Sequence, residues 1–186
     1  MLSPYRIWTM VTMTLVIPWL IVLCWMDIRS RRLPNALTLG GLAGGLVLAA
    51  VRYGTDGFVD ALTAAGVCVL ILILPFLVRA AGGGDLKMLA ACGTFVGMRG
   101  VLLLFVAMSF SGLFVAIVML VARQASAHRL KHIFRSLFDW RYDRAAGKAA
   151  LPPREDESGR IPFSLAIASG TLITFFFDVF MPGAAQ

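Results

Sequence analysis

Apolar residues are arranged along the chain in about six long runs, which short polar segments separate. The runs cover residues 7–26, 36–51, 61–78, 85–97, 101–122 and 161–180. A helix needs about 20 apolar residues to cross the hydrocarbon core of a bilayer. The pattern therefore predicts an all-α, polytopic membrane protein with about six transmembrane helices, of which the 85–97 run is the shortest.

The composition supports this interpretation, because 59% of the 186 residues are hydrophobic and 15% are charged. The mean hydropathy is +0.84, and a soluble domain of this length has too little polar surface to cover so many apolar side chains. The first run is followed, not preceded, by its positive cluster, and no small-residue cleavage site is evident. We therefore expect it to remain as a helix within a single membrane-embedded domain over residues 1–186.

Basic residues predict the orientation of the chain. Fourteen of the 17 Lys and Arg residues fall in the segments that follow the first, third and fifth runs or begin the fourth. Positive residues concentrate on the cytosolic side of membrane proteins, so we expect the N-terminus outside and these segments in the cytosol. The net charge of +7 reflects this distribution, and we expect no nucleic-acid partner.

Residues 123–160 form the only sizeable extramembrane segment that the pattern predicts. Apolar residues recur there at helical spacing among basic ones: Leu130, Ile133, Phe134, Leu137 and Phe138. The spacing is compatible with an amphipathic helix on the anionic lipid surface, and equally with an ordinary connecting loop. Membrane lipids are expected contacts in either case.

Two carboxylates lie at the predicted cytosolic rim. Asp27 ends the first run and Asp85 opens the fourth, 58 residues later but at the same depth. Each alone is explained by structure, since a charged residue often closes a membrane helix and Asp favours a helix start. The three glycines at 82–84 change the balance, because they permit unusual backbone conformations and close approach of another chain.

Three motifs resemble one family. Gly82-x-Gly84-Asp85-x-Lys87 is similar to the signature of the type IV prepilin peptidases. Asp27, followed by the Pro34-Asn35 pair, resembles their other aspartate motif, and Ile-Pro-Phe at 161–163 resembles the start of their final helix. The short form, without a large inserted domain, is most similar to peptidases of tight-adherence (Flp-type) pilus systems.

The resemblance implies an aspartic endopeptidase in a bacterial inner membrane, with Asp27 and Asp85 as the catalytic pair facing the cytosol. Two carboxylates held close share a proton, so that one acts as base and the other as acid. The implied substrate is a prepilin, whose short basic leader is cut before its hydrophobic helix. Contact with pilus assembly or secretion machinery is a further implication, and we expect no cofactor.

The resemblance also gives supporting roles. Gly82, Gly84 and Pro162 belong to the motifs, and Pro34-Asn35 is expected to turn and cap the second helix. Lys87 is compatible with tuning the catalytic pair or with anchoring to lipid phosphate.

Two features depart from the family pattern. Ser164 stands where family members often have glycine, which affects local packing. The paired Cys-x-x-Cys motifs of larger members are missing from the sequence, so we predict no methyltransferase activity.

Other motifs have simpler explanations. The two Gly-x-x-x-Gly pairs within residues 40–45 predict close helix packing. The three cysteines have no paired spacing, and His128 and His132 lack the glutamate of zinc hydrolases. We therefore expect no metal site.

Three other functions compete with the prepilin peptidase. Transporters usually place ionisable groups near the midplane, where these runs have none. A related intramembrane protease shares the Gly-x-Gly-Asp chemistry, but the Pro-Asn and Ile-Pro-Phe motifs favour the prepilin side. A non-catalytic scaffold of a pilus or secretion assembly leaves both Asp motifs unexplained.

Overall fold

The computed structural model describes residues 4–30, 33–77, 81–121 and 163–180, and these are helical almost throughout. The described part contains no strand and forms four helices: α1 (Pro4–Ser30), α2 (Asn35–Leu77), α3 (Gly83–Val121) and α6 (Phe163–Phe180). Each of the four is long and apolar enough to cross a membrane. The predicted all-α class is confirmed for this part of the chain.

Two of these helices contain a break. α2 has 43 residues and α3 has 39, so straight helices would be about 64 Å and 58 Å long at 1.5 Å per residue. That is roughly twice the hydrocarbon thickness. Gly54 (φ 69°, ψ −145°) interrupts α2 and Gly97 (φ 74°, ψ 170°) interrupts α3, in a region of φ that glycine enters without steric cost. The breaks separate the predicted second span from the third and the fourth from the fifth; six membrane crossings stay a prediction.

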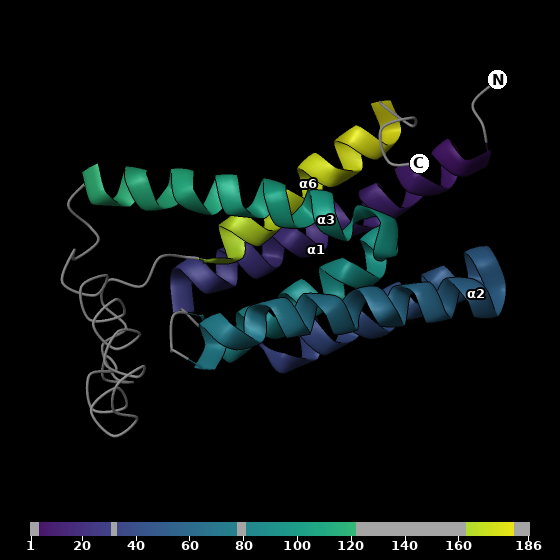
Figure 1. Cartoon of the computed structure of the whole chain (residues 1–186), viewed down its shortest axis with the longest axis horizontal. Coiled ribbons are helices and arrows are strands. Elements are labelled where there is room, and N and C mark those ends of the chain that lie inside the picture. Colours follow the sequence, from purple (N-terminus) through teal and green to yellow (C-terminus); the bar gives the residue numbers. More distant parts are fainter. Residues whose placement is uncertain (1–3, 31–32, 78–80, 122–162, 181–186) are drawn as a thin grey trace.

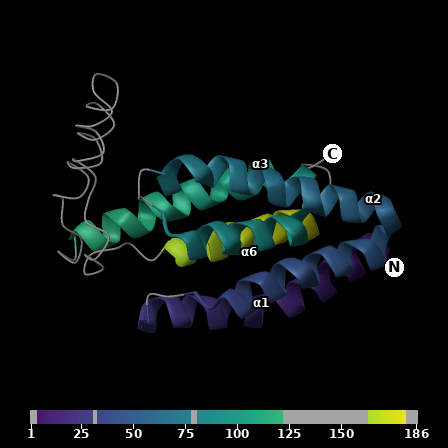
Figure 2. The same cartoon turned by 90° about the horizontal axis from the view of Figure 1, so that it is seen from below.

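Both long helices fold back on themselves at these breaks, as Figures 1 and 2 show. For α2 the contacts agree with the pictures. Lys87 in α3 donates a hydrogen bond to Asn35 at the start of α2, and a Cβ added at Gly83 would lie 3.6 Å from Phe76 near the end of α2. Both ends of α2 therefore lie beside the first turns of α3.

The break in α3 is stabilised from α2. Asp60 Oδ2 accepts a hydrogen bond from the backbone N–H of Met98 at 3.1 Å. The first N–H groups of a helix have no partner within the helix, and Met98 restarts α3 after Gly97. The carboxylate of Asp60 thus caps the second half of α3.

The core of the bundle is formed by side chains from all four helices. Fully buried large residues include Leu20 and Leu23 in α1, Leu72 in α2, Met88, Leu89 and Leu104 in α3, and Ile167 in α6. Many other large apolar side chains point outward, among them Leu102, Phe110 and Leu70, which are 75%, 68% and 66% exposed. An apolar exterior of this extent suits a lipid environment.

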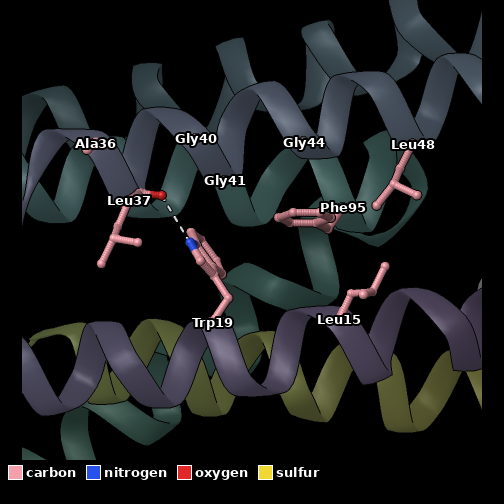
Figure 3. Close-up of a pocket in the computed structure, with 9 residues that line it drawn as sticks. All are labelled: Leu15, Trp19, Ala36, Leu37, Gly40, Gly41, Gly44, Leu48 and Phe95. Carbon is pink, nitrogen blue, oxygen red and sulfur yellow. Dashed lines mark hydrogen bonds between the residues drawn. The ribbon is translucent and has the colours of Figure 1, made fainter.

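Trp19 connects α1 to the first turns of α2 (Figure 3). Its Nε1–H donates a hydrogen bond to the carbonyl oxygen of Leu37 at 3.0 Å. The indole lies against Gly41, where an added Cβ would be 2.2 Å from Trp19 Cζ2. Gly45, one turn later, is equally close to Thr94 of α3. The predicted close packing is confirmed for this glycine pair.

The other glycine pair lies on an open face. A Cβ at Gly40 or Gly44 would meet no atom within 4 Å. Both residues line an apolar groove of about 270 Å³, together with Leu15, Trp19, Ala36, Leu37, Gly41, Leu48 and Phe95 (Figure 3). The prediction of close packing is therefore wrong for Gly40 and Gly44.

Several sequence expectations lie outside the described residues. They concern the amphipathic pattern within residues 123–160, the two histidines His128 and His132, and Pro162. They stay predictions.

Substituting alanine for neighbouring glycines of α2 tests the Trp19 contact. Gly41→Ala drives a methyl group into the indole, and overpacking of this kind costs about 1–3 kcal/mol. We expect Tm to fall by about 5 °C, given about 2–4 °C per kcal/mol at this chain length. Gly40→Ala meets open space, so its better helix propensity should leave Tm equal or slightly raised.

The three buried cysteines, Cys24, Cys68 and Cys92, provide the measurement. A thiol-reactive fluorescent dye reports their exposure on heating in detergent. Equal Tm values for the two alanine variants would contradict the packing described for Trp19.

Candidate active site

Asp27 lies in the last turn of α1. The helix continues to Ser30, about one turn beyond the predicted end at residue 26, because the helical hydrogen bonding does not stop where the apolar run stops. The Asp27 carboxylate is half-buried. Its Oδ2 accepts a short hydrogen bond from the hydroxyl of Ser164 in the first turn of α6. The hydroxyl thereby ties the end of α1 to the start of α6.

Asp85 lies in the first turn of α3, which begins at Gly83 and not at residue 85 as predicted. Asp85 Oδ2 accepts a hydrogen bond from the backbone N–H of Gly82 at 2.9 Å. The carbonyl of Gly82 accepts the N–H of Leu86 at 3.3 Å, so Gly82 is the N-cap residue and Asp85 the third residue of the helix. This is the acidic half of a capping box. The N-cap position considered for Asp85 therefore belongs to Gly82, and Asp85 stabilises the helix start as the partner of the N-cap backbone.

Two of the predicted supporting residues, Lys87 and Asn35, meet between the starts of α2 and α3. Lys87 Nζ donates a hydrogen bond of 2.7 Å to Asn35 Oδ1, a contact that was not among the roles considered for Lys87. The carbonyl of Pro34 accepts the N–H groups of Leu37 and Thr38 at 3.1 Å and 3.2 Å. Pro34 thus occupies the turn into α2, and the side chain of Asn35 connects to α3.

Gly84 permits the closest approach between these two segments. A Cβ added there would lie 2.9 Å from Cβ of Leu33, which is nearer than van der Waals contact allows. Leu33 precedes the Pro34-Asn35 turn. Because position 84 is glycine, its backbone packs directly against the side chain of Leu33. The sequence pattern identified Gly84, and Leu33 within the Pro-Asn motif, but did not predict the contact between them.

The two carboxylates lie at the same end of the bundle. Figures 1 and 2 both show the end of α1 at the same end of the bundle as the starts of α2 and α3, and the bond from Trp19 to Leu37 holds α1 against α2 two turns before Asp27. Direct pairing of Asp27 with Asp85 stays a prediction. The described residues of the site provide two oriented carboxylates, a lysine and an amide.

Ser164 is the site residue that sequence reasoning undervalued. It appeared only as a departure from a glycine in the family pattern. The sequence offered one indication of a polar role for this residue, a hydroxyl two residues after Pro162. The spacing of residues along the chain does not predict that Ser164 contacts Asp27. That contact depends on how α6 packs against α1.

A model of the type IV leader peptidase family matches residues 14–117, more than half of the chain. The chain belongs to the type IV leader peptidase family. The match covers Asp27, Asp85 and the turn between α1 and α2, whereas α6 with Ser164 follows it. No curated protein and no solved structure matches the chain. Membership identifies a leader-peptidase-like protease, and its apolar helices are those of a multi-pass membrane protein.

Alanine substitutions at two adjacent glycines test the geometry of the candidate active site. Gly84→Ala pushes the segment 82–87 away from Leu33 and shifts Asp85. Misplacing a catalytic group by about 1 Å can cost about 100-fold in rate, so we expect peptidase activity to fall by tenfold or more. Gly83→Ala has an ordinary contact with Phe76 and should stay within about twofold of the wild type.

Initial rates of peptide-bond cleavage, at matched amounts of protein in the membrane, give the comparison. Wild-type activity in Gly84→Ala would show that the contact with Leu33 does not hold the site in shape.

Proposed function

We propose that the protein is an aspartic endopeptidase that removes the short basic leader of type IV, Flp-like prepilins. The proposal places it in the bacterial inner membrane, with Asp27 and Asp85 acting at the cytosolic face. One observation carries the assignment of the pair. Each carboxylate lies in a terminal turn of a helix at the same end of the bundle. Asp27 accepts a hydrogen bond from Ser164 of α6, and Asp85 accepts one from the N-cap backbone of its own helix.

The chemistry follows from two adjacent carboxylates that share a proton. The ionised one accepts a proton from a water molecule, whose oxygen attacks the carbonyl carbon of the scissile peptide bond. The protonated one gives its proton to the carbonyl oxygen. When the tetrahedral intermediate collapses, the C–N bond breaks and the leaving amine takes the proton that the first carboxylate accepted from water. A hydroxyl of the intermediate returns a proton to the second carboxylate, which restores the pair and leaves a free carboxyl group on the product. The pair titrates as a unit, so the proton belongs to the pair and not to one residue.

The distribution of basic residues supports a cytosolic site, and the contact of Lys87 supports a role for this residue in helix packing. The basic residues that follow the first, third and fifth apolar runs support a cytosolic site by the positive-inside rule, on the side where a basic leader would remain. Lys87 is engaged with Asn35, which supports a role in fixing α3 against α2. Tuning of the pair by Lys87 and its anchoring to lipid phosphate stay predictions.

Replacing each aspartate tests the proposal. Asp27→Asn and Asp85→Asn keep the shape of the side chain but remove its acid–base function. Such a loss typically costs about 10²–10⁴-fold in rate, so leader removal should disappear in a co-expression assay followed by gel shift. Asp56→Asn changes an exposed carboxylate next to the break at Gly54 and should cut normally.

Normal cutting by either Asn variant would exclude the aspartic pair. A wild type that leaves every Flp-like prepilin uncut, while present in the membrane, would favour the non-catalytic scaffold or the small transporter.

A further inference from the structure

The hydroxyl of Ser164 is used differently from the other hydroxyls of α6. Ser169, Thr171 and Thr174 each donate to a carbonyl of their own helix. Ser164 lies too close to the start of α6 for such a bond within the helix, and its hydroxyl donates to Asp27 Oδ2 instead. The residue is fully buried, at 0% exposure. A buried hydroxyl that bonds a half-buried carboxylate on another helix calls for an explanation beyond helix formation.

A second contact fixes the position of this hydroxyl. The carbonyl oxygen of Ser164 accepts a hydrogen bond from Cys24 Sγ at 3.6 Å, and Cys24 lies about one turn before Asp27 on α1. The backbone and the side chain of Ser164 therefore both attach to α1. Buried Ala166, Ile167 and Ala168 hold the first turns of α6 in the core.

We propose that Ser164 is a positioning residue for the reaction, holding the carboxylate of Asp27 in the orientation that proton transfer requires. This inference rests on the proposed function. A carboxylate rotates easily about its Cβ–Cγ bond, and a donor on one oxygen fixes the plane of both. A general base must lie within about 2.6–3.2 Å of the heavy atom that carries the proton it accepts. Ser164 thus acts on the rate of the chemical step through Asp27, without touching the substrate.

Alanine and glycine at position 164 separate positioning from packing. Ser164→Ala keeps most of the volume and removes the donor, so kcat should fall by about tenfold with KM unchanged, as for an interaction used in the transition state. Ser164→Gly leaves a polar space large enough for a water molecule, which can donate to Asp27 in place of the hydroxyl. We therefore expect kcat of the glycine variant to lie between that of the alanine variant and that of the wild type.

Ser169→Ala is the matched control, because within the described part of the chain the Ser169 hydroxyl bonds to the backbone of its own helix. Its kcat and KM on a purified prepilin substrate should equal those of the wild type. If Ser164→Ala keeps wild-type kcat, or is more active than Ser164→Gly, volume and not the hydroxyl matters and the proposal is overturned.

A thermal measurement tests the contact independently of cleavage. Tm is measured for Ser164→Ala, Asp27→Ala and the double variant in detergent. Residues in direct contact give non-additive effects, so the Tm change of the double variant should differ from the sum of the single changes. Additive changes would overturn the inference even if the wild type cuts prepilin. Coupled changes in a protein that cuts no prepilin would reject the proposed function and leave Ser164 as the residue that holds Asp27.

Discussion

Backbone N–H and C=O groups inside a lipid bilayer have no water to bond, and each unsatisfied group costs several kcal/mol. This constraint underlies the whole of the described fold, in which nearly every backbone group belongs to a helix. It also limits where the chain can reverse. The two breaks within helices occur at glycines with positive φ, and at Gly97 the freed N–H of Met98 bonds to the carboxylate of Asp60. A reversal is therefore tolerated where glycine relieves the steric cost and a neighbouring helix supplies an acceptor.

The reversals determine what meets at the candidate active site. Because α2 folds back at Gly54, its first residue and its last turns both lie beside the start of α3. The Pro-Asn turn and the glycine-rich segment are about 50 residues apart in the sequence, yet Lys87 bonds Asn35 and Gly84 contacts Leu33. Small residues make these approaches possible, since an added Cβ at Gly41, Gly45 or Gly84 would overlap a neighbour.

Structural and catalytic explanations of a residue do not exclude one another here. Asp85 accepts the N–H of the N-cap residue Gly82, as expected for an acidic residue in the first turn of a helix. The same bond orients its carboxylate, which a catalytic role also needs. For Asp27 the orienting group comes from α6, a helix that begins 136 residues later in the sequence. The two carboxylates are thus held by very different devices, one local and one tertiary.

The sequence by itself determined the all-α class, the apolar segments, the motif residues and the family, because hydrophobic periodicity and residue spacing are local properties. Its segment bounds were close to the observed helices, and the breaks at Gly54 and Gly97 fall where it separated spans. Only the tertiary structure decided which glycines pack and which face an open groove, since Gly40 and Gly41 are alike in sequence but differ by their direction around the helix. It alone decided that Lys87 bonds Asn35 and that Ser164 holds Asp27. Such contacts depend on how separate helices pack, and no spacing along one helix encodes which side chain of another will lie opposite.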